Sequence, residues 1–152
     1  MGHPAATRNA LVDAVVIFES LTGNTAKAGR AVAAELSEAG LATQAFPIKE
    51  IDYQTLADAE LVIVGSWVDG LVFVGQRPGR LGRIKGMPAL GGKKAFVYLT
   101  YAIDAGKSLQ KLSDAVTARG AEVLGGQLIR RDKLEAGVAD FTAGVLEALP
   151  VS

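Results

Sequence analysis

Continuous apolar runs of strand length alternate along the chain with longer stretches that carry apolar residues at helical spacing. Residues 14–18, 61–64 and 95–99 are almost wholly apolar, whereas 41–46 and 122–129 mix apolar with polar residues. An unbroken apolar run is typical of a parallel strand that is buried on both faces of a sheet. We therefore expect 14–18 and 61–64 to be central strands and 41–46 to lie nearer an edge.

Helices are predicted between these strands, over residues 25–39, 107–119 and 132–149, with a short turn at 53–57. Each long helix carries apolar residues three or four positions apart, which is the spacing of one helix face. The three stripes are Ala28, Val32, Leu36 and Ala39; Leu109, Leu112 and Val116; and Leu134, Val138, Phe141 and Val145.

The segment 70–92 is rich in glycine and has a weaker pattern. Because proline is favoured at the first position of a helix, Pro78 is expected to open a short helix here. Leu81 and Ile84 would then face the core.

The alternation of strands and helices indicates one α/β domain over residues 11–152, preceded by a loose tail at 1–10. Strands joined by helical crossovers form a doubly wound parallel sheet, because right-handed crossovers place helices on both faces. The expected architecture is a three-layer α/β/α sandwich around a five-stranded sheet. In such sheets, ligands bind beyond the carboxyl ends of the strands.

Composition narrows the classes of function. The 152 residues include no cysteine, which excludes disulfides, thiolate chemistry and an iron–sulfur cluster. The single histidine, His3, lies in the tail, so a zinc site or a His-based triad is not expected. Sixteen basic and sixteen acidic residues cancel, which argues against a nucleic-acid partner. No apolar run reaches the roughly 18–20 residues of a membrane span and no signal peptide is seen, so the default location is the cytoplasm.

Residues 20–25, Ser-Leu-Thr-Gly-Asn-Thr, lie between the first strand and the first helix. A helix N-terminus presents unpaired backbone N–H groups and the positive end of the helix dipole, so it can bind an anion. Ser20, Thr22 and Thr25 could add hydroxyl donors, and Gly23 permits a close approach or a positive φ. An ordinary N-cap is the alternative, but this cluster of polar residues directly after a buried strand favours a phosphate site. The loop has neither the Gly-Lys-Ser/Thr of a Walker loop nor the three spaced glycines of a dinucleotide fingerprint.

Two further loops are expected at the same edge of the sheet. Trp67, the only tryptophan, lies in a predicted loop from Gly65 to Gly70, and Tyr101 lies in a predicted loop over 100–106. Each ring could simply cover the edge of the sheet, or it could stack on a planar ligand. A phosphate site beside two aromatic residues describes a ligand with an anionic tail and a flat ring. Flavin mononucleotide (FMN) fits this description.

The segment 20–25 resembles the first loop of flavodoxins and flavodoxin-like proteins, Ser/Thr-x-Thr-Gly-x-Thr, at every specified position. The resemblance extends over about 14–149 and implies the short-chain form of the family, the strand order 2-1-3-4-5 and non-covalently bound FMN. It also implies that segment 20–25 binds the FMN phosphate and that Trp67 and Tyr101 lie against the two faces of the isoalloxazine ring. The cofactor-binding residues that it implies are Ser20, Leu21, Thr22, Gly23, Asn24, Thr25, Ser66, Trp67, Val68, Thr100, Tyr101 and Ala102.

A run of basic residues follows the Trp67 loop and has no intervening acidic residue: Arg77, Arg80, Arg83, Lys85, Lys93 and Lys94. Many flavodoxins are strongly acidic, whereas this chain has no net charge. The run is either a solvated loop or a docking patch beside the flavin. In the second case, Arg77, Arg80, Arg83 and Lys85 would attract an acidic-faced redox partner.

Three functions are compatible with these features. The leading hypothesis is an FMN-binding carrier that shuttles electrons between a reductase and an acceptor, with no catalytic acid or base and no metal. The alternative is an enzyme, an NAD(P)H-dependent FMN reductase or quinone oxidoreductase. A flavin-free signalling domain is less favoured, because Glu19 and Asp69 are poor substitutes for the acidic residues that a receiver domain needs.

Overall fold

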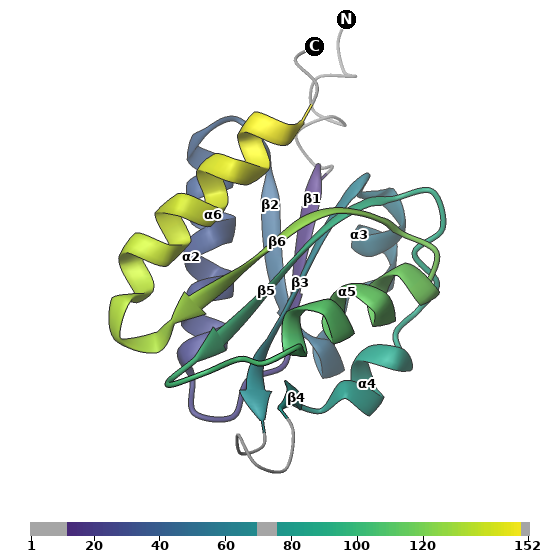
Figure 1. Ribbon diagram of the computed structural model, residues 1–152. Helices are drawn as coiled ribbons and strands as arrows, with labels where there is room; N and C mark the ends of the chain where they lie inside the picture. The colour runs from purple at the N-terminus through teal and green to yellow at the C-terminus, as the bar shows by residue number, and fades with distance from the viewer. Residues whose placement is uncertain (1–11, 70–75, 150–152) are drawn as a thin grey trace, which may run out of the picture.

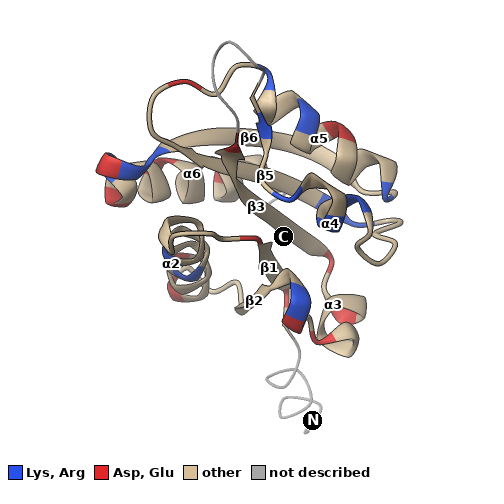
Figure 2. Ribbon diagram, turned by 90° about the horizontal axis from the view of Figure 1, so that it is seen from below, with Lys and Arg blue, Asp and Glu red and all other residues tan. Residues whose placement is uncertain are grey.

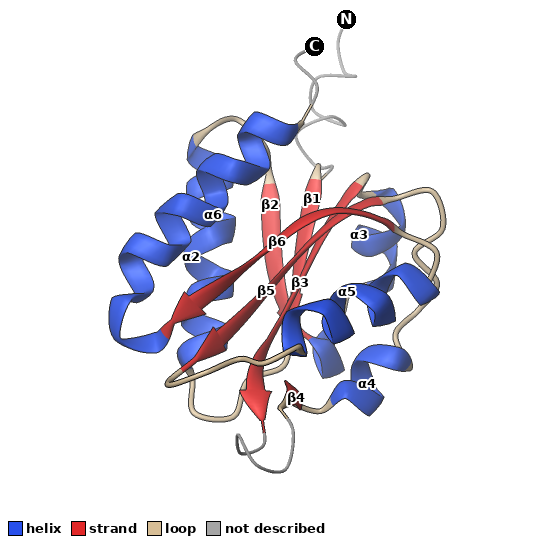
Figure 3. Ribbon diagram, viewed as in Figure 1, coloured by secondary structure: helices blue, strands red, loops and turns tan. Residues whose placement is uncertain are grey.

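The computed structural model describes residues 12–69 and 76–149. Its centre is a parallel sheet of five long strands in the order β2-β1-β3-β5-β6 (Figure 3). These strands are β1 (Ala14–Phe18), β2 (Thr43–Pro47), β3 (Leu61–Asp69), β5 (Lys94–Tyr101) and β6 (Glu122–Arg130). Counted over the long strands, the order is 2-1-3-4-5, so the predicted sheet is confirmed. A two-residue strand, β4 (Arg77–Pro78), pairs antiparallel with the end of β3.

Helices cover both faces of the sheet and complete the three layers (Figure 1). One face carries α2 (Asn24–Glu38) and α6 (Leu134–Ala148). The other carries α3 (Tyr53–Asp58), α4 (Leu81–Lys85) and α5 (Ser108–Ala118). Short 3₁₀ turns at Ile48–Glu50 (η1) and Arg131–Lys133 (η2) follow β2 and β6.

Alternate residues of each central strand point to the two faces and divide the core into two halves. Val16 and Ile63 pack with the buried stripes of α2 and α6, while Val15 and Val62 pack with α3, α4 and α5. Every residue of β1 is buried, as expected for a central strand. The mixed strand β2 lies at one edge of the sheet, which confirms its predicted position.

The third strand is longer than its apolar run predicts. The run ends at Val64, but β3 continues to Asp69, so Trp67 lies within a strand and the predicted loop there is wrong. The extension arises because Trp67 is still in register with Thr100 of β5, and Asp69 pairs with Arg77 of β4. Polar and glycine residues interrupt the apolar pattern, but partners on both sides keep the backbone extended.

Two other boundaries also differ from the prediction. Thr100 and Tyr101 are the last residues of β5 and not the start of a loop. Pro78 does not open a helix, because it belongs to β4, and α4 begins only at Leu81. Within α4, Ile84 is fully buried as predicted, whereas Leu81 is half-buried.

The expected tail at 1–10 and residues 70–75 of the glycine-rich segment lie outside the described residues. In the described part of the chain, no helix combines the length and apolar character that a membrane crossing requires.

Candidate functional site

The loop between β1 and α2 is shaped by one serine and one glycine. The Oγ atom of Ser20 accepts hydrogen bonds from the backbone N–H groups of Gly23 and Ala26, both at 3.2 Å. Gly23 has a φ of 100°, a left-handed conformation that favours glycine. Within the described residues, the N–H groups of Asn24 and Thr25 have no hydrogen-bond partner. The first turn of α2 therefore offers two free N–H donors.

A buried tyrosine of β5 sets the position of this helix. The hydroxyl of Tyr98 donates a 2.9 Å hydrogen bond to the carbonyl oxygen of Thr25. Its ring lies directly over Gly65 of β3, where an added Cβ atom would overlap it, and a Cβ at Gly29 of α2 would lie 2.6 Å from its hydroxyl oxygen. Burial raises the pKa of Tyr98 well above its usual value, so the phenol stays neutral and remains a donor. Two glycines and one tyrosine thus hold α2 close to the sheet.

A second buried contact joins the loop to the end of β5. The hydroxyl oxygens of Thr25 and Thr100 lie 2.8 Å apart, and both side chains are buried. Thr25 therefore directs its hydroxyl toward the sheet in this arrangement. Thr22 is exposed and Asn24 is half-buried, so these side chains are the ones that reach the surface of the loop.

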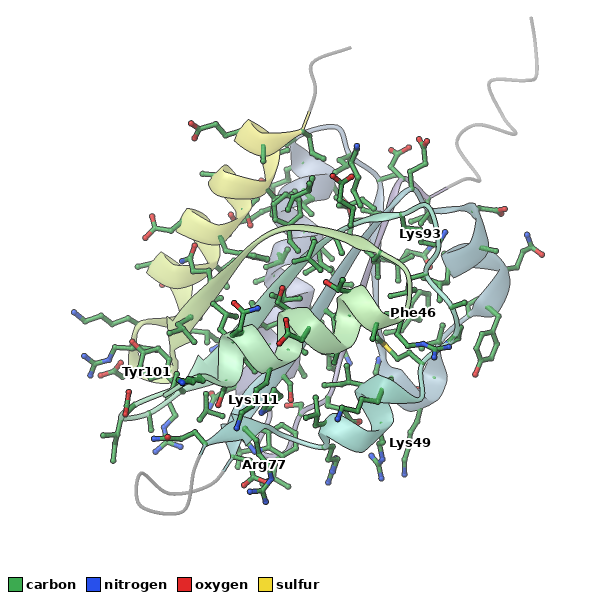
Figure 4. The ribbon with its side chains drawn as sticks, turned by 45° about the vertical axis from the view of Figure 1, so that its right-hand side comes forward. Phe46, Lys49, Arg77, Lys93, Tyr101 and Lys111 are labelled. Atoms are coloured by element: carbon green, nitrogen blue, oxygen red, sulfur yellow. The ribbon has the colours of Figure 1, made fainter. Side chains whose placement is uncertain are left out.

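A cavity of about 150 Å³ opens where this loop meets the ends of β3 and β5. Most of the predicted cofactor-binding residues line it: Leu21, Thr22, Asn24, Thr25, Trp67, Val68, Thr100, Tyr101 and Ala102. The structure thus brings together three segments that are far apart in the sequence. Figure 4 labels Tyr101, at the end of β5 near the site.

Three predicted residues do not line the cavity: Ser20, Gly23 and Ser66. Ser20 and Gly23 instead shape the loop, through the hydrogen bonds that the Ser20 Oγ atom accepts and the left-handed backbone of Gly23. Ser66 is fully buried, and its Oγ donates a 2.7 Å hydrogen bond to the carbonyl oxygen of Gly79. Gly79 in turn donates its N–H to the carbonyl oxygen of Trp67 at 2.7 Å. Ser66 therefore ties β3 to the segment after β4.

The indole of Trp67 is held by that same segment. The backbone of Gly79 lies so close to the ring that an added Cβ atom would overlap it. The guanidinium carbon of Arg80 lies 5.4 Å from the ring centroid, within the range of a cation–π contact. The indole of Trp67 therefore lines the cavity while Gly79 and Arg80 pack against it.

Sequence reasoning missed two charged groups at the site. Arg131, in the turn after β6, joins the cavity lining. Glu19 is only 5% exposed and binds Arg83 at 3.0 Å and Arg80 at 3.3 Å. The sequence drew attention to Arg80 and Arg83 as part of a basic run, but it did not predict that they pair with Glu19. An ion pair between residues more than sixty positions apart leaves no local pattern in the sequence. Across the described ranges, no cluster of three or more His, Asp or Glu side chains could hold a metal ion.

Comparison with known protein families identifies the family to which the chain belongs. A family model described as "Flavodoxin domain" matches residues 15–142. The chain belongs to the flavodoxin family. Membership supports a flavin cofactor and a role in electron transfer. The match includes β1 except Ala14, segment 20–25, and the strand ends that carry Trp67 and Tyr101.

Solved flavodoxins share the fold at low sequence identity. Oxidised Flavodoxin 2 from Bacillus cereus is 18% identical, with a TM-score of 0.71, and the match covers 91% of this chain and 100% of that one. A cysteine-to-serine mutant of flavodoxin from Pseudomonas aeruginosa is 18% identical, with a TM-score of 0.67 and coverage of 90% and 97%. Two-electron reduced Megasphaera elsdenii flavodoxin is 16% identical, with a TM-score of 0.64 and coverage of 84% and 98%. Comparison with the sequences of curated proteins gives no match.

The residues of the cavity fit a flavin nucleotide. Free N–H groups at Asn24 and Thr25 suit a phosphate, and the rings of Trp67 and Tyr101 on the adjoining strand ends suit a flat heterocycle. Arg131 adds a positive charge, which would attract an anionic ligand.

Proposed function

We propose that this flavodoxin-family protein binds FMN non-covalently in the cavity beside α2 and carries electrons between redox proteins. The observation that carries the proposal is the junction of two unpaired helix N–H groups with Trp67 and Tyr101 around one cavity. The N–H groups suit the phosphate end of the ligand, and the aromatic side chains suit its ring end.

Each segment of the cavity has a distinct role in this proposal. The N–H groups of Asn24 and Thr25 and the exposed hydroxyl of Thr22 bind the phosphate. Trp67 and Tyr101 contact the isoalloxazine ring, and their neighbours Ser66, Val68, Thr100 and Ala102 set the backbone around it. Leu21 closes the loop side of the cavity.

No side chain of the described cavity lining is a carboxylic acid, a histidine or a lysine, and the only ionisable groups there are Tyr101 and Arg131. This lining suits a carrier, because the bound flavin supplies the redox chemistry while the protein supplies binding, orientation and electrostatics. A reductase would also need room for a nicotinamide over one ring face, which closely stacked aromatic residues would occupy.

Absorption spectroscopy tests the proposal. We expect the purified protein, or the apoprotein after addition of FMN, to show the visible bands of bound flavin. Replacement of Trp67 by Ala should weaken binding by about tenfold, since a stacked aromatic contact contributes about 1–1.5 kcal/mol. Failure of the apoprotein to take up FMN would contradict the proposal.

Addition of NADPH to the holoprotein separates the carrier from the reductase. A carrier should remain oxidised until a separate flavoprotein reductase is added. Rapid bleaching of the flavin by NADPH alone would instead favour the NAD(P)H-dependent enzyme.

A further inference from the structure

A large groove lies along α4, on the side of that helix that carries Leu81 and Lys85. It has a volume of about 600 Å³ and runs between α4 and α5. Its apolar lining, which we call the floor, is small: half-buried Leu81 of α4, buried Ala115 and exposed Ala118 of α5. Two alanines three positions apart share one face of a helix, so another backbone can approach α5 closely there.

The rim of the groove is strongly basic. Arg77, Lys85, Lys111 and Arg119 line it, and Asp114 is the only acidic residue of the lining. Figure 2 shows the blue of lysine and arginine on both α4 and α5, and Figure 4 shows the labelled Arg77 and Lys111 on the same side of the molecule, below α5.

These cations are only partly neutralised within the protein. Arg77 faces Asp69 at 3.5 Å, in a contact where both side chains are about half exposed. Lys111 donates to the carbonyl oxygen of Gln76 at 2.9 Å, which leaves its charge uncompensated by any carboxylate in that contact. The Nε atom of Arg119 is buried and has no hydrogen-bond partner. The groove therefore keeps a net positive potential over an apolar floor.

We propose that this groove, lined by α4 and α5, is a docking site for an acidic amphipathic helix of a partner protein. An amphipathic helix laid in a groove buries its apolar stripe on the floor and places its flanking residues over the rim. Leu81, Ala115 and Ala118 suit such a stripe. Glutamate or aspartate on both flanks of the stripe would meet Lys85 on one side and Lys111 on the other, and complementary charge would fix the orientation.

The groove adjoins the proposed flavin site through β4. Arg77 at its rim pairs with Asp69 at the end of β3, and Gly79, two residues later, packs on Trp67. A helix docked here would bring its protein next to Trp67. That consequence for electron transfer rests on the proposed function, whereas the binding itself does not.

A peptide titration tests the docking site. The probe is a fluorescein-labelled peptide of about 18 residues, with leucine and alanine on one helical stripe and glutamate on the flanks, long enough for about five helical turns. Binding to the full-length protein is followed by fluorescence anisotropy, with and without added FMN. A scrambled peptide of the same composition controls for charge alone.

The variant Lys85→Glu/Lys111→Glu should weaken binding of the amphipathic peptide by about tenfold or more at low salt. The matched control Lys27→Glu/Lys133→Glu makes the same charge change on the opposite layer and should leave binding within about twofold. Ala118→Glu, which fills the floor, gives a second route to the same loss if the first variant fails to fold.

Amide chemical shifts should change along α4 and α5 when the peptide is added. No binding of the amphipathic peptide, equal binding of the scrambled peptide, equal loss in the control variant, or shift changes confined to other elements would each overturn the proposal. Because the flavin-free protein is titrated as well, failure of flavin uptake leaves this test intact.

Discussion

The guanidinium of Arg80 lies over the indole of Trp67, 5.4 Å from the ring centroid. The same guanidinium binds the buried carboxylate of Glu19 at 3.3 Å. Arg80 is also the only described non-glycine residue with a positive φ, at 51°. Such backbone strain is retained only where surrounding contacts demand it. Arg80 thus connects Glu19, the residue before segment 20–25, with Trp67, which lines the proposed flavin site.

Replacement of Arg80 by Gln should lower the reduction potential of the bound flavin by about 20–40 mV, because a positive charge near the ring stabilises the electrons that the flavin gains. Spectroelectrochemical titration measures the shift. Lys94→Gln removes a charge at the opposite end of the sheet and serves as the control. Equal shifts of the reduction potential in the two variants would mean that the charge of Arg80 does not act on the flavin more strongly than that of Lys94.

Replacement of Glu19 by Gln should destabilise the fold by about 1–2 kcal/mol. The loss is smaller than for a fully buried pair, because the side chains of Arg80 and Arg83 are both 39% exposed and solvent screens their charges. Urea unfolding measures the change in free energy. Glu122→Gln is the control, because it removes only a long, solvent-exposed ion pair with Lys94 at 3.9 Å. The free energy of unfolding should change by less than about 0.5 kcal/mol in this variant. Similar effects of the two substitutions would contradict a structural role for Glu19.

Thr25 and Thr100 should behave as a coupled pair. Thr25→Val or Thr100→Val alone leaves one buried hydroxyl without its partner, at a cost of about 1–2 kcal/mol, whereas the double substitution should cost less than the sum of the two. A double-mutant cycle in urea unfolding gives the coupling energy, and strict additivity would argue against the bond.

The same four proteins test the role of Thr25 in phosphate binding. If its hydroxyl stays on Thr100 when FMN binds, Thr25→Val in the parent background, with Thr100 intact, should leave the dissociation constant of FMN almost unchanged. A loss of tenfold or more in that background would show that the hydroxyl turns toward the phosphate.

Tyr98 should make stability fall at alkaline pH. Burial raises its pKa in the folded state, so the folded protein holds the phenolic proton more tightly than the unfolded chain, in which tyrosine titrates near its ordinary value of about 10. This contribution is complete below about pH 10 and is lost as the pH rises above it, by about 1.4 kcal/mol per pH unit.

Tyr98→Phe removes both this titration and the hydrogen bond to Thr25. The variant should be about 1 kcal/mol less stable at pH 7, and its free energy of unfolding should decline less steeply than that of the parent protein above pH 10. Urea unfolding over pH 7–11 compares the two slopes. Parallel curves would mean that Tyr98 ionises in the folded protein.

Local pattern was sufficient for most of the architecture. The apolar run at 14–18 and the stripe of the helix that became α2 were predicted from spacing alone, because side-chain burial repeats with the geometry of a strand or a helix. Segment 20–25 was likewise predicted as the loop between the first strand and the first helix, and the family match supports the flavodoxin-type interpretation of the chain.

Tertiary structure decided the details of the site, since those depend on partners that are distant in the chain. Trp67 became part of a strand because β5 and β4 supply its neighbours, and Thr25 turned its hydroxyl to Thr100, seventy-five positions away. The charge of Arg80 was visible in the sequence, but its two contacts, Glu19 and Trp67, arise only when β1, β3 and the segment after β4 meet. Periodicity records whether a residue is buried; it carries no record of which residue it meets.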